Sequence, residues 1–351
     1  MLMPVIISLL VSTILLNFGG PFGGQFLWPK NINSAKVGLV LGVSEYQAAG
    51  KIMVEEGDNF NQAMVKVIEE IKSLPLPQLP QLNLPTEKLP PERGKYATAK
   101  TVSFDLAAEN GAILDGQSQD LFFSKRPDRT WPIASLTKLF TAYTFLDYNP
   151  GWEIIYEIKP GDKREGGKIY LFTGDKVKVK DLFYFSLVGS DNTATAALVS
   201  STGLTEAEFV AKVNNKIKEL GLKNTRIADV VGLGDGNIST AREIAQFANI
   251  ALETEKISRA SLTKKYEFTT EQGRKKSITS TNELLNIFPE SKISLLGGKT
   301  GYINASGYCL VSKFKGQDGR SIVTVVLGAD SDASRFSLTK ELVNLYYGAK
   351  P

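Results

Sequence analysis

A proline-rich segment sets the first limit on how this chain can fold. Residues 75–93 read PLPQLPQLNLPTEKLPPER, with prolines at positions 75, 77, 80, 85, 90 and 91. Proline fixes its φ angle and lacks a backbone N–H, so this segment cannot form a helix. An extended polyproline II conformation, at roughly 3 Å per residue, predicts a semi-rigid spacer of about 50 Å. The alternative is a ligand for a proline-binding module.

The chain before the spacer begins with a segment suited to a membrane. Residues 1–29 carry no charged side chain and start with an apolar run from Met1 to Phe18. A basic flank and a small-residue cleavage site are missing, so both a cleaved signal peptide and a retained anchor fit. A buried core helix is the alternative. Either membrane interpretation places the rest of the chain outside the cytoplasm, in the cell envelope or secreted.

An amphipathic helix is expected between these two segments, over residues 58–74. Asp58 or Asn59 can cap it, and its apolar residues recur at helical spacing: Phe60, Met64, Val67, Ile68 and Ile71. The expected organisation is a signal peptide or anchor in residues 1–29, a juxtamembrane helix and spacer in 30–95, and a folded domain in 96–351.

The folded domain begins and ends with strand-like sequence. Residues 101–115 alternate apolar and polar side chains around Asn110-Gly111, which predicts a β-hairpin. Residues 307–315 and 321–329 form another alternating pair, and an amphipathic helix follows. A long, mainly helical stretch lies between. This order predicts an α+β fold, with an antiparallel sheet flanked by helices and interrupted by an all-helical insertion, and a ligand cleft between the two parts.

Composition excludes several kinds of chemistry. The chain has no histidine and one cysteine, Cys309. Ser-His-Asp and Cys-His sites are therefore impossible, and zinc sites and intrachain disulfides are not expected. The 41 basic and 37 acidic residues give a net charge of +4 without a concentrated basic stripe, so nucleic acid is not an expected partner. Any nucleophilic catalysis needs a lysine or a carboxylate as its base.

The tetrapeptide SLTK occurs three times, at residues 135–138, 261–264 and 337–340. A serine one helical turn from a lysine can be a nucleophile beside its base. The third copy lies on the polar face of the C-terminal helix, and the second precedes an expected strand, so we expect both at the surface. The first is followed by LFTAYTFL, which places apolar groups on every side of a helix and predicts its burial.

A buried hydroxyl and amine at the start of a helix are costly unless they serve a cleft. The free backbone N–H groups there also suit a developing oxyanion. Because a free lysine has a pKa near 10.4, holding it neutral at pH 7 costs roughly 4 to 5 kcal/mol. Burial and a second cation can supply that shift. The sequence should therefore supply a second cation and a polar residue that holds the amine.

Both occur downstream, as SDN at Ser190–Asn192 and KTG at Lys299–Gly301. Another S-x-N, at residues 280–282, leaves too short a chain before Lys299 to build a helical subdomain. GGKT also resembles the end of a phosphate-binding loop, but that motif needs glycine where Ile293 stands and a helix after the threonine. The remaining alternative for Lys299 is a strand-edge lysine with no ligand.

With these motifs, residues 96–347 resemble the low-molecular-mass penicillin-binding proteins, the D-alanyl-D-alanine carboxypeptidases and related endopeptidases. The resemblance extends to PIASLTKLFTAY, GLKNTRIADVVGLGDGNISTAREIA, TNELLN and GGKTGYINASGYCLV. It implies a β-lactamase/transpeptidase-like fold. Two departures exist: SDN stands where these carboxypeptidases usually show S-G-N, and no separate C-terminal domain follows, which would move any membrane tether to the N-terminus.

The resemblance implies that Ser135 is the acylated nucleophile and Lys138 its base. Ser190 would place a hydroxyl between Lys138 and the leaving amine, and the backbone N–H groups of Ser135 and Tyr302 would form the oxyanion hole. Ser135 would attack the carbonyl between two D-alanines of a peptidoglycan stem peptide, release the last residue, and leave an acyl-enzyme for hydrolysis. β-Lactams would be covalent inhibitors, and no metal or organic cofactor is needed.

The substrate-binding residues implied in the same way lie downstream of the nucleophile. Asn192 would hold the peptide amide of the substrate. Lys299 and Thr300 would bind its terminal carboxylate, with Arg242 of the STAR sequence as a helper. The full set is Asn192, Arg242, Lys299, Thr300, Gly301 and Tyr302.

Three alternatives stay open. A class A β-lactamase needs a glutamate in an E-x-x-L-N pattern, and the nearest match, Glu283–Asn286, has the wrong spacing. A wall-binding or β-lactam-sensing module could keep the motifs without turnover. A DD-endopeptidase would cut cross-links between stems, which present the same acyl group to the serine.

Overall fold

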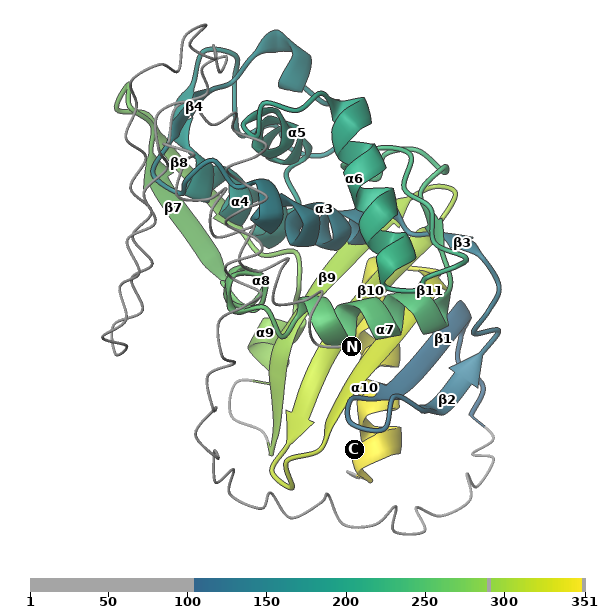
Figure 1. Cartoon of the computed structure of the whole chain (residues 1–351). Coiled ribbons are helices and arrows are strands. Elements are labelled where there is room, and N and C mark those ends of the chain that lie inside the picture. Colours follow the sequence, from purple (N-terminus) through teal and green to yellow (C-terminus); the bar gives the residue numbers. More distant parts are fainter. Residues whose placement is uncertain (1–103, 289–291, 349–351) are drawn as a thin grey trace, which may run out of the picture. The chain divides into compact units, whose positions relative to one another are not determined.

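The computed structural model describes residues 104–288 and 292–348 (Figure 1). The predictions for residues 1–29, for the helix at 58–74 and for the spacer lie outside the described residues. Within the described residues, no helix combines the length and apolarity needed to cross a membrane.

A five-stranded antiparallel sheet forms the base of the domain, in the order β2-β1-β11-β10-β9. The predicted strand pair near the C-terminus is confirmed, and one further strand, β9, extends the sheet to an edge. Because β9 contains Lys299, the KTG motif lies on this edge strand. The strands are β1 (Ala108–Asp115), β2 (Leu121–Lys125), β9 (Ile293–Ile303), β10 (Gly307–Gly316) and β11 (Ser321–Ala329).

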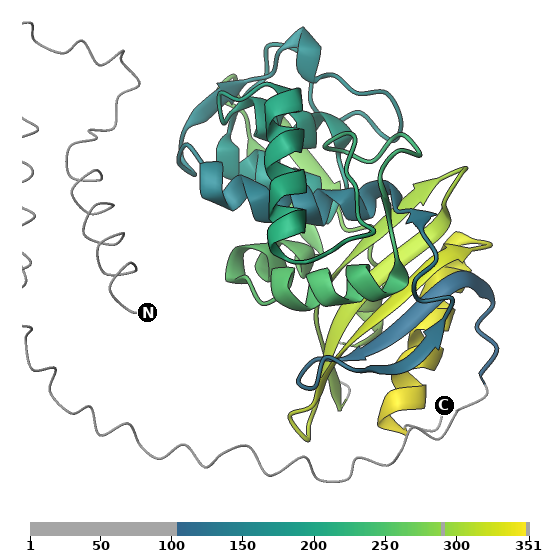
Figure 2. The same cartoon turned by 45° about the vertical axis from the view of Figure 1, so that its right-hand side comes forward.

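Helices cover both faces of this sheet, which explains why its central strands are buried at almost every position. On β10, Cys309 and Val311 pack toward α7 (Ala241–Ala251), while Leu310 and Phe314 pack toward α10 (Asp332–Tyr347). Figure 2 shows α7 and α10 on opposite faces of the sheet. The amphipathic C-terminal helix predicted from the sequence is confirmed as α10.

The predicted turn at Asn110-Gly111 is wrong, because β1 runs straight through both residues and pairs with β11. A Cβ atom at Gly111 would lie 2.1 Å from Leu106 Cδ2, so this glycine permits close packing against Leu106. The turn forms after Asp115, whose Oδ1 accepts hydrogen bonds from the N–H groups of residues 117 and 118. Aspartate followed by glycine supplies the turn chemistry there.

The inserted part is mainly helical, with α3 (Thr137–Phe145) at its centre (Figure 1). It also contains small two-stranded sheets, so the prediction of an all-helical insertion is wrong in this detail. The other helices are η1 (Ala134–Leu136), η2 (Leu146–Tyr148), η3 (Pro160–Asp162), α4 (Val179–Val188), α5 (Asn192–Ser200), α6 (Glu206–Glu219), α8 (Glu255–Ser261) and α9 (Leu284–Ile287). The short strands are β3 (Trp131–Pro132), β4 (Ile155–Glu157), β5 (Lys176–Lys178), β6 (Ile238–Ser239), β7 (Lys265–Thr269) and β8 (Lys275–Thr279).

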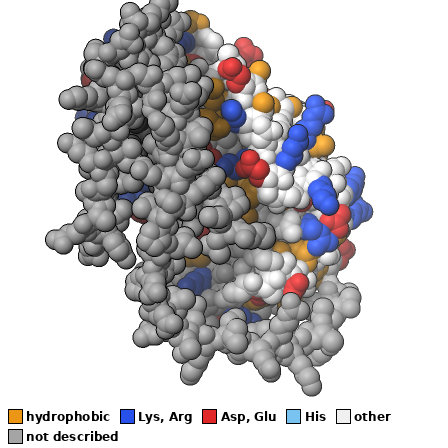
Figure 3. Space-filling view, viewed as in Figure 1, with side chains coloured by type: hydrophobic (Ala, Val, Ile, Leu, Met, Phe, Trp, Pro, Cys, Tyr) orange, Lys and Arg blue, Asp and Glu red, His pale blue; other side chains and the backbone are white. Residues whose placement is uncertain are grey.

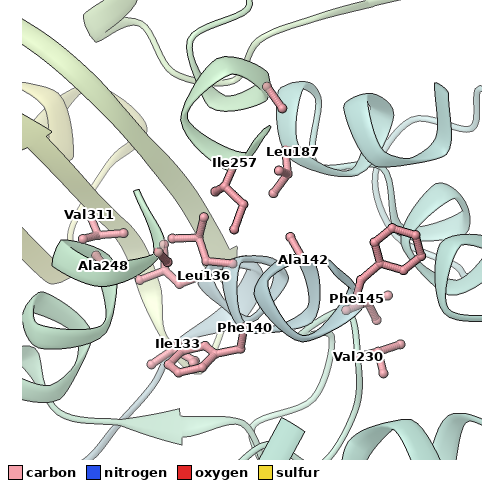
Figure 4. Close-up of a cluster of buried hydrophobic side chains, with 14 of the residues drawn as sticks. Ile133, Leu136, Phe140, Ala142, Phe145, Leu187, Val230, Ala248, Ile257 and Val311 are labelled. Atoms are coloured by element: carbon pink, nitrogen blue, oxygen red, sulfur yellow. The ribbon is translucent and has the colours of Figure 1, made fainter. Parts of the chain in front are cut away.

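Helix α3 is buried on almost every side, as its sequence predicts. Its Phe140 stacks on Phe247 of α7, with ring centroids 3.7 Å apart. Each fully buried large apolar side chain contributes roughly 1.5–3 kcal/mol to folding. Figure 4 shows the cluster around this helix, whose labelled members include Leu136, Ala142, Phe145, Leu187, Val230, Ile257 and Val311.

Basic and acidic side chains are interspersed on the part of the surface visible in Figure 3. Ion pairs among the described residues include Glu153 with Lys178 and Lys180. The charge distribution on this face therefore contains no continuous basic stripe.

Candidate active site

The first SLTK copy begins in a constrained turn. Ser135 lies in η1, immediately after Ala134, whose φ of 46° is unfavourable for a residue with a Cβ atom. Two glycines allow other segments to approach closely: a Cβ at Gly232 would lie 2.0 Å from Ala134 O, and a Cβ at Gly301 would lie 3.2 Å from Ser135 N. The turn is therefore held between the KTG strand and the segment containing Gly232.

Lys138 lies one turn into the buried helix, and its side chain makes three polar contacts. Its Nζ atom lies 2.9 Å from Ser135 Oγ, 2.8 Å from Asn192 Oδ1 and 2.8 Å from the carbonyl oxygen of Val231. The last two atoms can only accept hydrogen bonds. A neutral amine has two N–H groups and one lone pair, so these two acceptors use both N–H groups. The lone pair then faces the hydroxyl of Ser135, which is the arrangement that proton abstraction requires.

The amine of Lys138 is fully buried, and burial lowers its pKa to about 7. The carboxylates of Asp191 and Asp229 act in the opposite direction, because negative charge favours the protonated amine. Asp191 is the N-cap of α5 and accepts a hydrogen bond from Ala194 N. Burial raises the pKa of Asp191 to about 6. A substantial fraction of Lys138 is therefore neutral at pH 7, as a general base needs.

Lys299 supplies the second buried amine of the site. Its Nζ atom donates to Ser190 Oγ and to the carbonyl oxygen of Thr300, both at 2.9 Å. Burial lowers its pKa well below the usual range, and the positive charges of Lys138 and Arg335 lower it further. Two buried ammonium groups disfavour each other, so the protonation of either amine depends on the other.

Ser190 lies between α4 and α5 with a φ of 59°, a left-handed conformation that the tight connection imposes. Its hydroxyl is hydrogen-bonded to Lys299, whereas the polar side chain that holds Lys138 is Asn192. The family resemblance implied a Ser190 hydroxyl between Lys138 and the leaving amine. Ser190 joins the site through the KTG lysine in this structure.

Hydrogen bonds from Thr281 and Arg335 hold the rest of the KTG segment. Thr300 Oγ1 lies 2.5 Å from Thr281 Oγ1, and the carbonyl oxygen of Gly301 accepts a hydrogen bond from Arg335 at 3.1 Å. Tyr302 is 48% exposed, and its ring stacks on Tyr308 with centroids 4.3 Å apart. The S-x-N triplet at residues 280–282 thus contacts the KTG motif through Thr281.

The guanidinium of Arg242 is paired with a residue outside the KTG motif. Its guanidinium forms a two-point ion pair with Asp128, with distances of 2.6 and 2.9 Å. Within residues 104–288 and 292–348, no hydrogen bond of Arg242 reaches Lys299 or Thr300. The pairing with Asp128 lowers the pKa of that carboxyl group and raises that of the guanidinium.

The other two SLTK copies lie elsewhere. The prediction that Ser261 is at the surface is wrong: it ends α8, is only 2% exposed, and donates to Ser258 O. Its hydroxyl also accepts a hydrogen bond from Gly298 N at 3.4 Å. Lys264 is exposed. Ser337 is exposed on α10, as expected.

Sequence reasoning missed the main-chain groups of the site. The carbonyl oxygen of Val231 accepts from Lys138, and that of Gly166 accepts from Asn192 Nδ2 at 3.0 Å. A backbone acceptor leaves no side-chain signature in the sequence. Only Gly232 gave a signal, because a glycine there permits close approach to the nucleophile turn.

Comparisons with known proteins agree with this geometry. A family model described as D-alanyl-D-alanine carboxypeptidase matches residues 95–331. The D-alanyl-D-alanine endopeptidase of Haemophilus influenzae is 33% identical over 243 residues, which cover 68% of this chain and 81% of that protein. The D-alanyl-D-alanine carboxypeptidase DacF of Bacillus subtilis is 28% identical over 251 residues, covering 68% and 62%.

Solved structures give the same result for the fold. The crystal structure of a Streptomyces DD-transpeptidase matches with a TM-score of 0.65 at 25% identity, covering 70% of this chain and 99% of that one. A penicillin-binding protein of Listeria monocytogenes, in its cefotaxime-bound form, matches with a TM-score of 0.60 at 25% identity, covering 70% and 98%.

Proposed function

The chain belongs to the D-alanyl-D-alanine carboxypeptidase family, and we propose that it removes the terminal D-alanine from peptidoglycan stem peptides. One observation carries the proposal: the buried amine of Lys138 lies 2.9 Å from the hydroxyl of Ser135 and has acceptors for both of its N–H groups. This arrangement supplies a nucleophile and a base in a chain without histidine.

In the acylation step, Lys138 takes the proton of Ser135 while Oγ bonds to the carbonyl carbon between the two D-alanines. The negative charge that develops on the carbonyl oxygen is stabilised by backbone N–H groups at Ser135 and Tyr302. The close approach of Gly301 to Ser135 N supports this pairing. The C–N bond then breaks, and the proton passes from Lys138 to the leaving amine. Ser190 completes the polar path on that side.

Because the two amines are buried close together, substrate binding at Lys299 changes the protonation of Lys138. We assign Lys299 and Thr300 to the terminal carboxylate of the substrate. An anion beside Lys299 favours its protonated form, and a charged Lys299 in turn favours neutral Lys138. Substrate binding therefore places the proton on the amine that binds and leaves the other amine free to accept one. Hydrolysis of the acyl-enzyme by water completes the turnover.

A synthetic stem pentapeptide tests this function. Incubation with the purified protein should release D-alanine and leave a tetrapeptide, both detected by mass spectrometry. Labelling by a fluorescent penicillin should be covalent and stoichiometric, and the cefotaxime-bound relative supports this expectation. Fast multiple turnover of a chromogenic β-lactam would instead indicate a β-lactamase. Glu283 is exposed, which does not suit the deacylating glutamate of that class.

Cleavage of cross-links between stems is the second candidate, favoured by the endopeptidase relative with 33% identity. Cross-linked muropeptides offered beside the pentapeptide separate the two activities. Release of monomeric stems from the cross-linked substrate, with the pentapeptide left intact, would assign the protein as an endopeptidase.

We also propose that the protein acts outside the cytoplasm, attached through residues 1–29 or secreted after their removal. The support is the uncharged, apolar sequence of this segment and the location of peptidoglycan. Cell fractionation of the full chain beside a variant lacking residues 1–29 tests it. Recovery of the full chain in the cytoplasm would contradict the proposal.

A further inference from the structure

The carbonyl group that accepts from Lys138 belongs to a segment, residues 228–232, that lies against helix α3. Two hydrogen bonds join them directly: Lys138 Nζ donates to Val231 O at 2.8 Å, and Thr141 Oγ1 donates to Val230 O at 2.7 Å. Asp229 Oδ1 closes the turn by accepting from the N–H groups of Val231 and Gly232. The position of this segment therefore determines where the amine of Lys138 finds its acceptor.

Asn237 holds this segment with every hydrogen-bonding group of its side chain. Oδ1 accepts from Ala228 N at 2.7 Å and Asp229 N at 3.0 Å. Nδ2 donates to Asp229 O at 2.8 Å and to Thr137 Oγ1 at 2.9 Å. The residue is fully buried. A carboxamide has two donors and two acceptor positions, so all of its capacity is used and its orientation is fixed.

The same residue is tied to both sides of the nucleophile. Its main-chain carbonyl oxygen accepts from Ile133 N at 3.0 Å, before Ser135. Its side chain reaches Thr137, after Ser135, and the hydroxyl of Thr137 donates to Ala134 O at 2.7 Å. One asparagine thus connects the nucleophile turn, the helix of the base and the segment carrying the acceptor carbonyl.

We propose that Asn237 is a positioning residue that directs the lone pair of Lys138 toward Ser135 by fixing the Val231 carbonyl group. This inference rests on the proposed function, because it assigns a purpose to the orientation of the base. A neutral amine can rotate about its last carbon–nitrogen bond. Two fixed acceptors, Asn192 Oδ1 and Val231 O, select the one rotation in which the lone pair faces the hydroxyl.

Loss of the Asn237 side chain would allow one of these acceptors, the carbonyl group of Val231, to move. An N–H group of Lys138 could then turn toward Ser135, and the fraction of productive orientations would fall. A misplacement of about 1 Å in a reacting group can lower a rate by about a hundredfold. The effect belongs to the chemical step, so it should lower the rate of acylation more than the binding of substrate.

A second readout follows from the surroundings of the amine. The charged groups that face Lys138 are Asp191, Asp229 and Lys299. Burial is the largest influence on the pKa of Lys138 and lowers it, whereas the two carboxylates raise it. A loosened segment admits water and weakens that cause, so the pKa should rise. The acid limb of the pH–rate profile would then move to higher pH.

Asn214 offers a matched control. It is also an asparagine that uses its amide on the same stretch of chain: Oδ1 accepts from Ile227 N at 3.0 Å, and Nδ2 donates to Ile227 O at 2.7 Å. It joins this stretch to α6 and, among the described residues, forms no hydrogen bond with the helix of the base. Its loss should weaken the fold without releasing the Val231 carbonyl.

The experiment compares the full-length wild type with Asn237→Ala and Asn214→Ala. The second-order rate constant of acylation by a fluorescent penicillin is measured between pH 5 and 10, beside the melting temperature of each protein. Both variants should melt at lower temperature. We expect Asn237→Ala to lose about a hundredfold in acylation rate, with its acid limb at higher pH, and Asn214→Ala to stay within about twofold of the wild type.

A wild-type rate and pH profile in Asn237→Ala, or an equal loss in both variants, would overturn the inference. Absence of labelling in the wild type would instead reject the proposed function, so the two failures differ. If Asn237→Ala does not fold, the acylation rate of Thr141→Val is measured instead. It removes the short bond of Thr141 Oγ1 to Val230 O, together with the weaker one, 3.3 Å long, to Thr137 O within the same helix. It keeps the shape of the side chain and should lower acylation severalfold; an unchanged rate overturns the inference.

Discussion

The first and second SLTK copies have the same four residues and opposite surroundings. Lys138 is fully buried and contacts Ser135, whereas Lys264 is exposed. The serines differ in their place relative to a helix: Ser135 precedes α3, whereas Ser261 ends α8. A spacing of three residues brings two side chains to one helix face only when the chain between them is helical.

The comparison shows that burial of the lysine, and not the SLTK sequence alone, allows Lys138 to act as a base. A lysine in water keeps its pKa near 10.4 and is almost entirely protonated at pH 7. The first copy gains a neutral amine because helix α3 carries it into a place where burial is the largest influence on its pKa. The second copy leaves its helix at the serine, so its lysine stays in solvent.

The largest expected effect comes from exchanging the two serines for alanine in separate variants. Ser135→Ala removes the nucleophile and should lower D-alanine release by about a thousandfold or more, with complete loss of penicillin labelling. Ser261→Ala should keep both activities. It should lower stability by about 1 kcal/mol, because Ser258 O and Gly298 N lose a partner.

Assays of both variants by mass spectrometry and by urea unfolding check this. Loss of labelling in Ser261→Ala with retained labelling in Ser135→Ala would assign the chemistry to the wrong copy.

The lysines extend the comparison with a smaller effect. Lys138→Met removes the base while filling a similar volume, and should slow acylation by about a hundred- to a thousandfold. Lys264→Met changes an exposed side chain and should leave the rate within about twofold. Stopped-flow labelling with a fluorescent penicillin measures both rates. Equal rates in Lys138→Met and the wild type would mean that another group accepts the proton.

The smallest effect comes from Asp191, whose charge opposes the neutral state of Lys138. Asp191→Asn keeps a capping side chain on α5 and removes that charge. The pKa of Lys138 should fall, so the acid limb of the acylation profile should move to lower pH. A limb at the wild-type position, or at higher pH, would contradict this sign.

The same variant tests a stability effect. Burial raises the pKa of Asp191 from 3.8 to about 6, so the folded protein holds its proton more tightly than the unfolded chain. The stability from this proton is fully present below pH 3.8 and is lost as pH rises through about 6. The wild type should therefore lose on the order of 2–3 kcal/mol relative to Asp191→Asn across this window, measurable by urea unfolding at pH 4 and pH 7.

Sequence predicts the parts of this molecule that periodicity and burial control. The strands at residues 307–316 and 321–329, the helix after them and the buried helix of Lys138 all follow from side-chain patterns. The wrong predictions have one cause in common: each depends on a contact with another segment of the chain. Gly111 looked like a turn residue but serves close packing against Leu106, and Ser261 looked exposed but bonds a neighbouring strand.

The contacts that complete the site are of the same long-range kind. The acceptor carbonyl of Val231 and the pairing of Ser190 with Lys299 join segments far apart in the chain. No local pattern records which backbone oxygen will face an amine. Such contacts depend on the assembled fold, so the sequence indicated the residue types of the site better than their partners.

The topology of the sheet has a consequence for the order in which the domain can assemble. Strand β11 lies between β1 and β10, and Ala108 pairs with Ala329, at opposite ends of the described domain. During synthesis β1 and β2 are made first, and β1 cannot pair with β11 until nearly the whole domain has been synthesised. Contacts between such distant segments form slowly and leave strand edges open in the meantime. We therefore expect the last strand to complete the sheet in a single late step, with protection of β1 from hydrogen exchange appearing only then.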